Sequence, residues 1–218
     1  MNIELVILDF DGTIGDTNEV IIETLLGTMA ELGLEPRSRE ACNATIGLPL
    51  AEGFRMLYPD LSEEHIEYCA ETYRKLFVNN RQRSRTTLFP HVKETLERLK
   101  SSGIRIAIAS SRRHESLEVM VDEVGIREYV SFVIGTDEVE HPKPEPEMVL
   151  KTLAYFGVDA ARTLVVGDAP YDILMGKSAG CHTCAVTYGN GSLDELRAAG
   201  ADRLTDNFAD ILQLLAYS

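Results

Sequence analysis

An apolar run that ends in acidic residues constrains the fold of this chain most strongly. Leu5-Val6-Ile7-Leu8 is followed directly by Asp9-Phe10-Asp11-Gly12-Thr13. Such a run is typical of a strand buried on both faces of a parallel sheet. Ligands of open α/β sheets bind beyond the carboxyl ends of the strands. We therefore predict a site at Asp9 and Asp11, whose like charges favour a bound cation, although Asp and Gly also form ordinary turns.

The C-terminal two thirds of the chain predict that this strand belongs to a Rossmann-like parallel sheet. Apolar runs alternate there with helical patterns. The expected strands are 104–109, 132–134, 163–166 and 183–186, and the expected helices are 90–102, 114–124, 145–156, 171–179, 192–199 and 208–215. This alternation implies parallel strands covered by helices on both faces. We assign residues 1–15 and 86–218 to one α/β core domain.

Residues 16–85 are predicted to form an all-helical cap domain inserted into that core. Asp16 or Thr17 is expected to cap a helix that runs to about Leu34. Further helical segments are expected at 38–44, 50–57 and 62–79, with no strand from Asp16 to Asn79. The polar run 79–85 is expected to be the linker back to the core. Its arginines are either solvated or include one that reaches an anionic substrate.

Composition excludes several kinds of partner. The chain has 218 residues and a formal net charge of -14, with no long basic stretch, so nucleic acid is not an expected partner. No apolar run approaches the roughly 20 residues of a membrane span, and we expect no membrane partner. The N-terminal sequence does not resemble a signal peptide, so we expect a cytoplasmic protein. Because the chain is acidic, phosphate binding would require local positive charge, such as a metal ion.

The four cysteines allow two interpretations. Cys181-His-Thr-Cys184 has the spacing of a zinc or redox motif. A zinc site usually needs a second ligand pair, and no other pair of cysteines in the sequence has matching spacing. The same segment also fits a buried strand, and free cysteines are often simply buried. We favour burial.

Polar groups follow four predicted core elements in turn. The first strand ends in Asp9 to Thr13, and the next ends in Ser110-Ser111-Arg112. Lys143 precedes a helix, and Asp168 follows a strand, with Asp172 four residues later. Each has an ordinary alternative as a helix cap or a surface residue. Their common position at one sheet edge indicates a functional site instead.

This order of motifs resembles the haloacid dehalogenase superfamily, specifically its phosphohydrolases. Residues 9–13 match the first motif, Ser110 the second, Lys143 the third and residues 167–172 the fourth. The resemblance covers essentially the whole chain. A helical insertion directly after the first motif is similar to the type 1 cap of this family.

The resemblance implies a phosphatase that forms an aspartyl phosphate. Asp9 would attack phosphorus, and Asp11 would act as the general acid and then the general base. Ser110 and Lys143 would bind the phosphoryl oxygens, which must be neutralised during phosphoryl transfer. Haloacid dehalogenases proper lack the second acid, because halide leaves without a proton, so Asp11 favours phosphoryl transfer.

The resemblance also implies a magnesium site and a substrate-binding set. The metal would be held by Asp9, the backbone carbonyl of Asp11 and Asp168, and Asp172 would support this group; such oxygen ligands suit Mg²⁺. Amides at Asp11, Gly12 and Ser111 are expected to complete an oxyanion cradle. The substrate-binding residues are expected to be Gly12, Thr13, Thr45, Gly47, Ser111 and Arg112.

The expected substrate is a small phosphorylated metabolite or pyrophosphate. The cap turn Thr45–Leu50 is similar to that of phosphoglycolate phosphatases and related pyrophosphatases. Sugar-phosphate mutases tend to carry His where this chain has Ile21, which makes a mutase less favoured. A receiver domain that only accepts phosphate is less favoured, because receivers are shorter and lack the helical insertion. An inactive relative of the phosphatases is also less favoured, because all the motif residues are present. A monomer and a homodimer both remain open.

Overall fold

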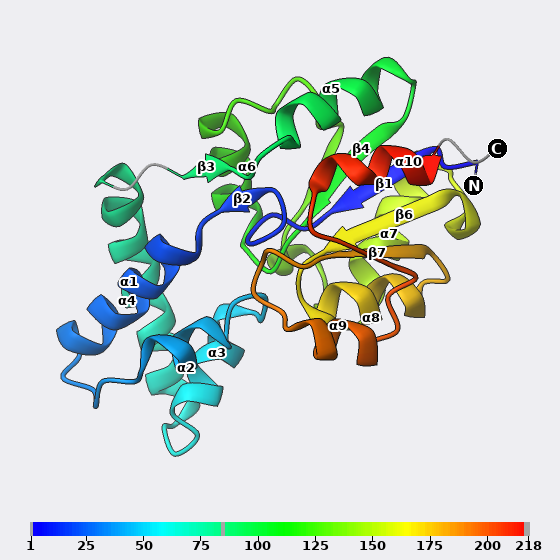
Figure 1. Cartoon of the computed structure of the whole chain (residues 1–218). Coiled ribbons are helices and arrows are strands. Elements are labelled where there is room, and N and C mark those ends of the chain that lie inside the picture. The colour runs from blue at the N-terminus through cyan, green and yellow to red at the C-terminus, as the bar shows by residue number, and fades with distance from the viewer. Residues whose placement is uncertain (1, 84–85, 216–218) are drawn as a thin grey trace.

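The structure is a computed structural model that describes residues 2–83 and 86–215, and it contains a six-stranded parallel sheet (Figure 1). The strand order is β5-β4-β1-β6-β7-β8. The strands are β1 Leu5–Leu8, β4 Arg105–Ala109, β5 Phe132–Ile134, β6 Thr163–Gly167, β7 His182–Val186 and β8 Arg203–Thr205. This confirms the predicted Rossmann-like α/β fold.

The apolar run of β1 lies at the centre of the sheet and is buried on both faces. Val6 and Leu8 belong to one hydrophobic cluster, and Leu5 and Ile7 to another. Side chains alternate between the faces of a strand, so a strand covered by helices on both sides needs apolar residues at every position. Strand β4 flanks β1 on one side and β6 on the other.

Helices cover the two faces of the sheet. They are α5 Val92–Ser101, α6 His114–Glu123, α7 Glu147–Phe156, α8 Pro170–Ser178, α9 Leu193–Ala198 and α10 Ile211–Leu215, with 3-10 turns at Thr136–Glu138, Ala160–Arg162 and Phe208–Asp210. Apolar residues of α5, α6 and α10 share the cluster of Val6 and Leu8, whereas those of α7 share the cluster of Leu5 and Ile7. The resulting three layers leave the carboxyl ends of the strands open for a site.

A separate helical lobe, α1 to α4, lies beside the sheet (Figure 1). Its helices are α1 Asn18–Glu31, α2 Arg39–Asn43, α3 Leu50–Leu57 and α4 Glu63–Arg83. Phe54 meets Tyr73 edge-on, and Tyr73 stacks on Phe77 with ring centroids 5.8 Å apart. The contact between Phe54 and Tyr73 holds α3 against α4, and that between Tyr73 and Phe77 lies within α4. Two short strands, β2 Gly15–Asp16 and β3 Thr87–Leu88, pair where the chain enters and leaves the lobe.

Two local predictions are wrong, and strands β3 and β8 were not predicted. Asp16 lies in β2, although no strand was expected from Asp16 to Asn79; β2 forms because two connecting segments distant in sequence run side by side. Helix α4 continues to Arg83, so most of the predicted linker 79–85 is helix, while Ser84 and Arg85 lie outside the described residues. Strand β8 was not predicted, because a three-residue edge strand is too short to show a clear period.

The structure also shows where the four cysteines lie and whether any helix could cross a membrane. Cys42, Cys69, Cys181 and Cys184 are buried and unpaired, which confirms the prediction that the last two are buried. Burial raises the pKa of the Cys181 and Cys184 thiols to about 12. In the described ranges, no helix is both long and apolar enough to cross a membrane.

Candidate active site

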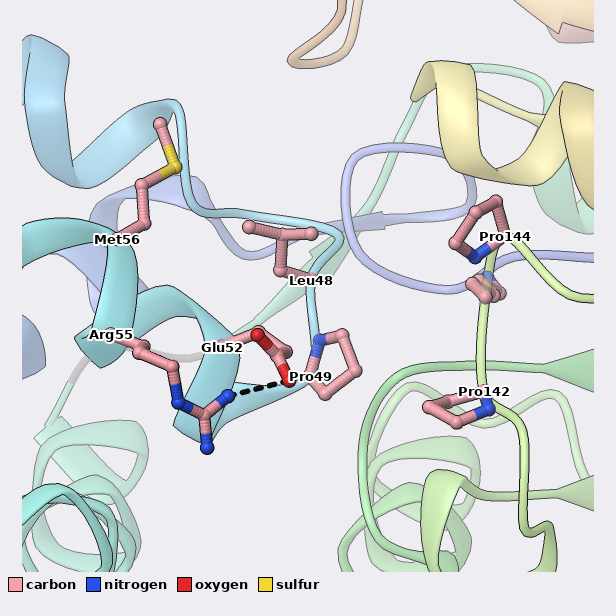
Figure 2. A pocket seen from close by; sticks show the side chains of 8 residues that line it. Leu48, Pro49, Glu52, Arg55, Met56, Pro142 and Pro144 are labelled. Atoms are coloured by element: carbon pink, nitrogen blue, oxygen red, sulfur yellow. Dashed lines mark ion pairs between the residues drawn. The ribbon is translucent and has the colours of Figure 1, made fainter. Parts of the chain in front are cut away.

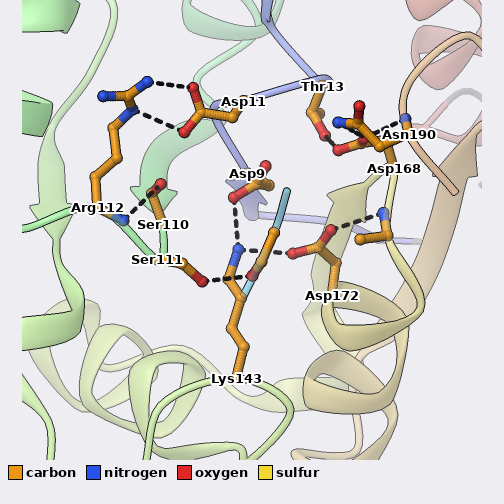
Figure 3. A network of polar contacts seen from close by, with 12 residues as sticks. Asp9, Asp11, Thr13, Ser110, Ser111, Arg112, Lys143, Asp168, Asp172 and Asn190 are labelled. Atoms are coloured by element: carbon orange, nitrogen blue, oxygen red, sulfur yellow. Dashed lines mark hydrogen bonds and ion pairs between the residues drawn. The ribbon is translucent and has the colours of Figure 1, made fainter. Parts of the chain in front are cut away.

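The polar residues predicted to share a site meet at one edge of the sheet (Figure 3). Asp9 follows β1 and Asp168 follows β6, and these two strands are neighbours in the sheet. From β1 the chain first adds β4 and β5 on one side and then crosses to add β6, β7 and β8 on the other, so the strand order reverses between β1 and β6. Such a reversal is where open α/β sheets bind ligands. Ser110 follows β4, Lys143 precedes α7, and Asp172 lies in the first turn of α8. All five side chains are buried.

Lys143 joins two carboxylates of this cluster. Its Nζ donates to Oδ1 of Asp9 at 2.5 Å and to Oδ1 of Asp172 at 2.6 Å. Burial acts to lower the pKa of the Lys143 ammonium, but the charges and hydrogen bonds of Asp172 and Asp9 outweigh it and raise that pKa. Lys143 is therefore a permanent cation that orients Asp9.

Three carboxylates lie close enough to share a metal ion. Asp9, Asp168 and Asp172 each offer one oxygen, and these oxygens lie within 4.8 Å of one another. Burial raises the pKa of Asp9 well above its usual value despite Lys143. Burial and the charge of Asp172 raise the pKa of Asp168 to about 7. Three buried carboxylates with one ammonium leave excess negative charge, so this donor set fits a hard divalent cation such as Mg²⁺.

Asp168 is held by residues from two loops. Its Oδ1 accepts from the Thr13 hydroxyl at 2.8 Å, and its Oδ2 accepts from the backbone amide and the side-chain amide of Asn190 at 2.7 and 2.9 Å. A Cβ on Gly12 would lie 2.2 Å from Oδ2 of Asp168, so the turn requires glycine here. Oδ1 of Asn190 is buried without a donor from the described residues, which suits a water molecule retained by a metal.

Asp11 is turned away from this cluster. Its carboxylate accepts from Nε and Nη2 of Arg112, both at 2.7 Å, and from the Thr17 hydroxyl at 2.6 Å. Figure 3 shows Asp11 pointing toward Arg112 rather than toward Lys143. The carboxylate of Asp11 is not among the three that lie together. The atom of Asp11 expected to bind the metal is the backbone carbonyl oxygen, and this role stays a prediction.

Several residues expected to bind substrate donate hydrogen bonds to backbone carbonyls in this structure. The Ser111 hydroxyl donates to the carbonyl of Gly47 at 2.7 Å and so joins the core to the turn before α3. The Thr45 hydroxyl donates to the carbonyl of Cys42 at 2.7 Å, within the helical lobe itself. The Gly12 amide donates to the carbonyl of Gly15 at 3.0 Å. The tight turn after β1 uses that amide in this conformation, and its expected place in an oxyanion cradle stays a prediction.

A cavity of about 550 Å³ lies between the sheet edge and the helical lobe, and we call it the inter-lobe cavity. Asp9, Asp11, Ser110 and Arg112 line its core side. The lobe side is mostly apolar, with residues of α1, of the turn 45–49 and of α4, among them Ile21, Leu25, Ile46, Leu48, Tyr73, Phe77 and Val78. This volume is ample for a small ligand.

A second cavity of about 480 Å³ lies on the other side of the turn 45–49 (Figure 2). Leu48, Pro49 and Met56 of the helical lobe face Pro142 and Pro144 of the core loop, and Glu52 pairs with Arg55 within α3. Lys143 also lines this cavity, but its ammonium is committed to Asp9 and Asp172. Of the residues of the site, Asp9, Asp11, Ser110 and Arg112 line the inter-lobe cavity instead.

Three residues of the site were not predicted for the positions they occupy, and a fourth, Arg81, lies in the segment 79–85, for which an arginine near an anionic substrate was the open alternative. Asn190 lies in the polar loop Thr187–Ser192 directly after β7, so the strand-end rule applied to the other motifs could have found it. Thr17 was expected only as a helix cap, but its hydroxyl binds Asp11. Phe77 and Arg81 line the inter-lobe cavity from α4. Arg81 pairs with Glu123 of α6 at 2.8 Å.

The fold and the site together define a class: phosphate-ester hydrolases with a Rossmann-like core, an acidic site at the sheet edge and a helical insertion after the first strand. The family model described as haloacid dehalogenase-like hydrolase matches residues 6–186. The chain belongs to this family, and it is a phosphatase.

Relatives of known name extend over nearly the whole chain. "Probable phosphatase IndB" of Dickeya dadantii (strain 3937) is 35% identical over 95% of this chain and 91% of that protein. Pyrophosphatase PpaX of Anoxybacillus flavithermus is 31% identical over 99% of this chain and 98% of that protein. A crystal structure described as a "predicted phosphoglycolate phosphatase" from Haemophilus somnus 129pt has a TM-score of 0.86 at 24% identity, with 98% of both chains covered. This last likeness bears on the fold alone.

Proposed function

We propose that the protein is a magnesium-dependent phosphatase that hydrolyses a small phosphorylated metabolite through an aspartyl phosphate, as in phosphoglycolate phosphatases. The observation that carries the proposal is the buried bridge from Lys143 to Asp9 and Asp172, beside Asp168. This bridge orients one oxygen of Asp9. Among the described residues, side-chain hydrogen bonds reach only Oδ1 of Asp9, so Oδ2 is available to attack phosphorus.

The reaction proceeds in two displacements. An oxygen of Asp9 forms a bond to phosphorus while the ester P–O bond breaks, and Asp11 gives its proton to the departing oxygen. Water then attacks phosphorus, Asp11 takes the proton of that water, and the bond between Asp9 and phosphorus breaks to release phosphate. Lys143 and Ser110 bind the phosphoryl oxygens in both steps.

The metal would be held by Asp9, Asp168 and the backbone carbonyl of Asp11, with Asp172 supporting the set through Lys143. When bound, Mg²⁺ supplies positive charge to the phosphoryl oxygens. Thr13 and Asn190 fix the orientation of Asp168, as residues behind metal ligands commonly do.

The helical lobe is proposed to act as the cap that selects the leaving group, with 16–85 as the cap and 1–15 and 86–218 as the core. Pyrophosphate is the second candidate substrate, favoured by the similarity to PpaX proteins. A sugar-phosphate mutase is disfavoured by Ile21. A receiver-like protein that only accepts phosphate is disfavoured because the family is one of hydrolases. A cytoplasmic location and a monomeric or homodimeric state remain predictions from the sequence.

The test compares Asp9→Asn with the matched control Asp16→Asn, whose side chain is exposed in β2. Phosphate release is measured with Mg²⁺ on a panel of phosphate monoesters and pyrophosphate. Asp9→Asn should lose at least a thousandfold in turnover while remaining folded, and the control should match the parent. Mass spectrometry of the acid-quenched parent should find phosphate on the peptide that contains Asp9. Substantial turnover by pure, folded Asp9→Asn would refute the role of Asp9.

A further inference from the structure

Arg112 is a buried cation committed to one partner. Its side chain is 10% exposed, and both hydrogen bonds described for its guanidinium go to the carboxylate of Asp11. The ring of Phe77 from α4 lies over the guanidinium, with its centroid 4.6 Å from Cζ. Arg112 therefore lies where the core loop after β4 meets the helical lobe, on the wall of the inter-lobe cavity.

The pairing of Arg112 with Asp11 conflicts with the role of Asp11 as general acid. Both oxygens of Asp11 accept hydrogen bonds from Arg112, and one accepts a further bond from Thr17. In Figure 3 the carboxylate points away from Asp9, beside which the departing oxygen must lie. Asp11 therefore has to turn from Arg112 toward the departing oxygen before it can transfer a proton. That movement removes the one carboxylate bound to Arg112.

A buried guanidinium that loses its only anionic partner is strongly destabilised. The buried carboxylate nearest the chemistry, Asp9, is bound to Lys143, and the side of α4 presents the rings of Tyr73 and Phe77. The other carboxylates that line the cavity, Glu115 and Asp137, are exposed, and Asp137 accepts from the His114 amide. The leaving group of a bound substrate extends from the departing oxygen into this same cavity. An anionic group on the leaving group could therefore occupy the place that Asp11 vacates.

We propose that Arg112 binds an anionic group on the leaving group, a carboxylate or a second phosphate, and thereby releases Asp11 for catalysis. The inference rests on the proposed phosphatase function and adds the substrate class: phosphate esters or anhydrides whose leaving part carries its own negative charge. Substrates with a neutral leaving group leave the pair of Arg112 and Asp11 intact, so they react slowly even when their phosphate is bound.

The test uses two esters of nearly equal size that differ in charge. Phosphoglycolate carries a carboxylate where 2-hydroxyethyl phosphate carries a hydroxymethyl group. The parent enzyme should prefer phosphoglycolate at least tenfold in kcat/KM, as expected for one charge-assisted bidentate pair. In Arg112→Met this preference should fall to about one, because phosphoglycolate loses its bidentate partner while 2-hydroxyethyl phosphate reacts faster once Asp11 is no longer held by Arg112. Pyrophosphate as a third substrate shows whether the preferred anion is a carboxylate or a phosphate.

Two further variants keep the inference falsifiable. Arg113→Met removes the exposed neighbouring arginine that also lines the cavity and should keep the parental preference. Arg112→Lys keeps the charge without the bidentate geometry and should give an intermediate preference, which decides the matter if Arg112→Met does not fold.

Three results would overturn the inference. They are a parental preference near one, an equal loss on both esters in the Arg112 variants, as a purely structural role predicts, and an Arg113→Met effect as large as that of Arg112→Met. Absence of magnesium-dependent turnover on every ester would instead refute the proposed function.

Discussion

The two sides of the inter-lobe cavity hold their polar groups in different ways. On the core side, Asp9 lines the cavity and is joined through Lys143 to Asp172, and these three side chains are buried together with Asp168. On the lobe side, the wall is mostly apolar, and the Ser111 hydroxyl binds only a backbone carbonyl there, that of Gly47. The core side therefore holds the groups that act on the phosphoryl group, which all phosphate esters share. The lobe side faces the leaving group, which differs between substrates.

The two sides of the cavity should also differ in how much they contribute to stability. On the core side the Lys143 ammonium offsets part of the negative charge of the buried carboxylates, so its removal leaves those charges unpaired and costs much stability. The lobe side depends on packing and on a few contacts with the core, so changes there should alter selectivity more than stability. The following changes test that division from the largest expected effect to the smallest.

Lys143→Met should have the largest effect. It leaves Asp9 and Asp172 facing each other without a cation, which should lower the free energy of unfolding by about 3–5 kcal/mol in chelator and reduce turnover more than a hundredfold. Urea unfolding and phosphate release measure the two effects. Lys151→Met is the matched control, because Lys151 is an exposed lysine paired with Glu147 on α7, and it should change neither. A metal-free Lys143→Met as stable as the parent would contradict the buried-charge argument.

Removal of metal should make the stability of the core side depend on pH. The pKa of Asp168 is raised to about 7 in the folded protein, so the folded state binds a proton that the unfolded state has already released above its ordinary pKa of about 4. Stability contributed by that proton is complete below pH 4 and is lost as pH rises through 7. In chelator, the melting temperature should therefore fall between pH 5 and pH 8, by roughly 5–10 °C.

Magnesium should reverse this trend, because it binds the ionised carboxylates and only the folded state assembles them. The rise in melting temperature on addition of Mg²⁺ should be larger at pH 8 than at pH 5. Asp168→Asn is the control and should reduce the slope in chelator, while the part due to Asp9, whose pKa burial also raises, should remain. A melting temperature that is flat or rises with pH in the chelated parent would contradict the assignment.

The same division explains what the sequence alone could predict. The core-side residues were found because the strand-end rule brings Asp9, Ser110 and Asp168 to one edge without any knowledge of side-chain packing. The pairing of Asp11 with Arg112 joins residues 101 positions apart, and no local pattern encodes it. The contact of Phe77 with Arg112 depends on how the helical lobe sits against the core, and apolar periodicity along α4 indicates only that Phe77 faces other apolar groups.

The smallest expected effect concerns Gly47, and Gly33 supplies its control. Both have positive φ, at 98° and 64°, so either change to Ala should cost about 1 kcal/mol of stability through the backbone alone. A Cβ on Gly33 would have no neighbour within 4 Å, whereas one on Gly47 would lie 3.2 Å from Cβ of Ala169 and 3.7 Å from the ring of Tyr171. Only Gly47→Ala should therefore displace the turn 45–49 from the core.

If that turn contacts the leaving group, Gly47→Ala should change the ranking of substrates by a few fold, while Gly33→Ala should leave it unchanged. The measurement is kcat/KM for phosphoglycolate, pyrophosphate and p-nitrophenyl phosphate in both variants and the parent. A uniform decrease in Gly47→Ala would mean that the turn closes the site without selecting among substrates. Selection would then lie with Arg112 on the core side and the residues of α4 on the lobe side, because these also line the inter-lobe cavity.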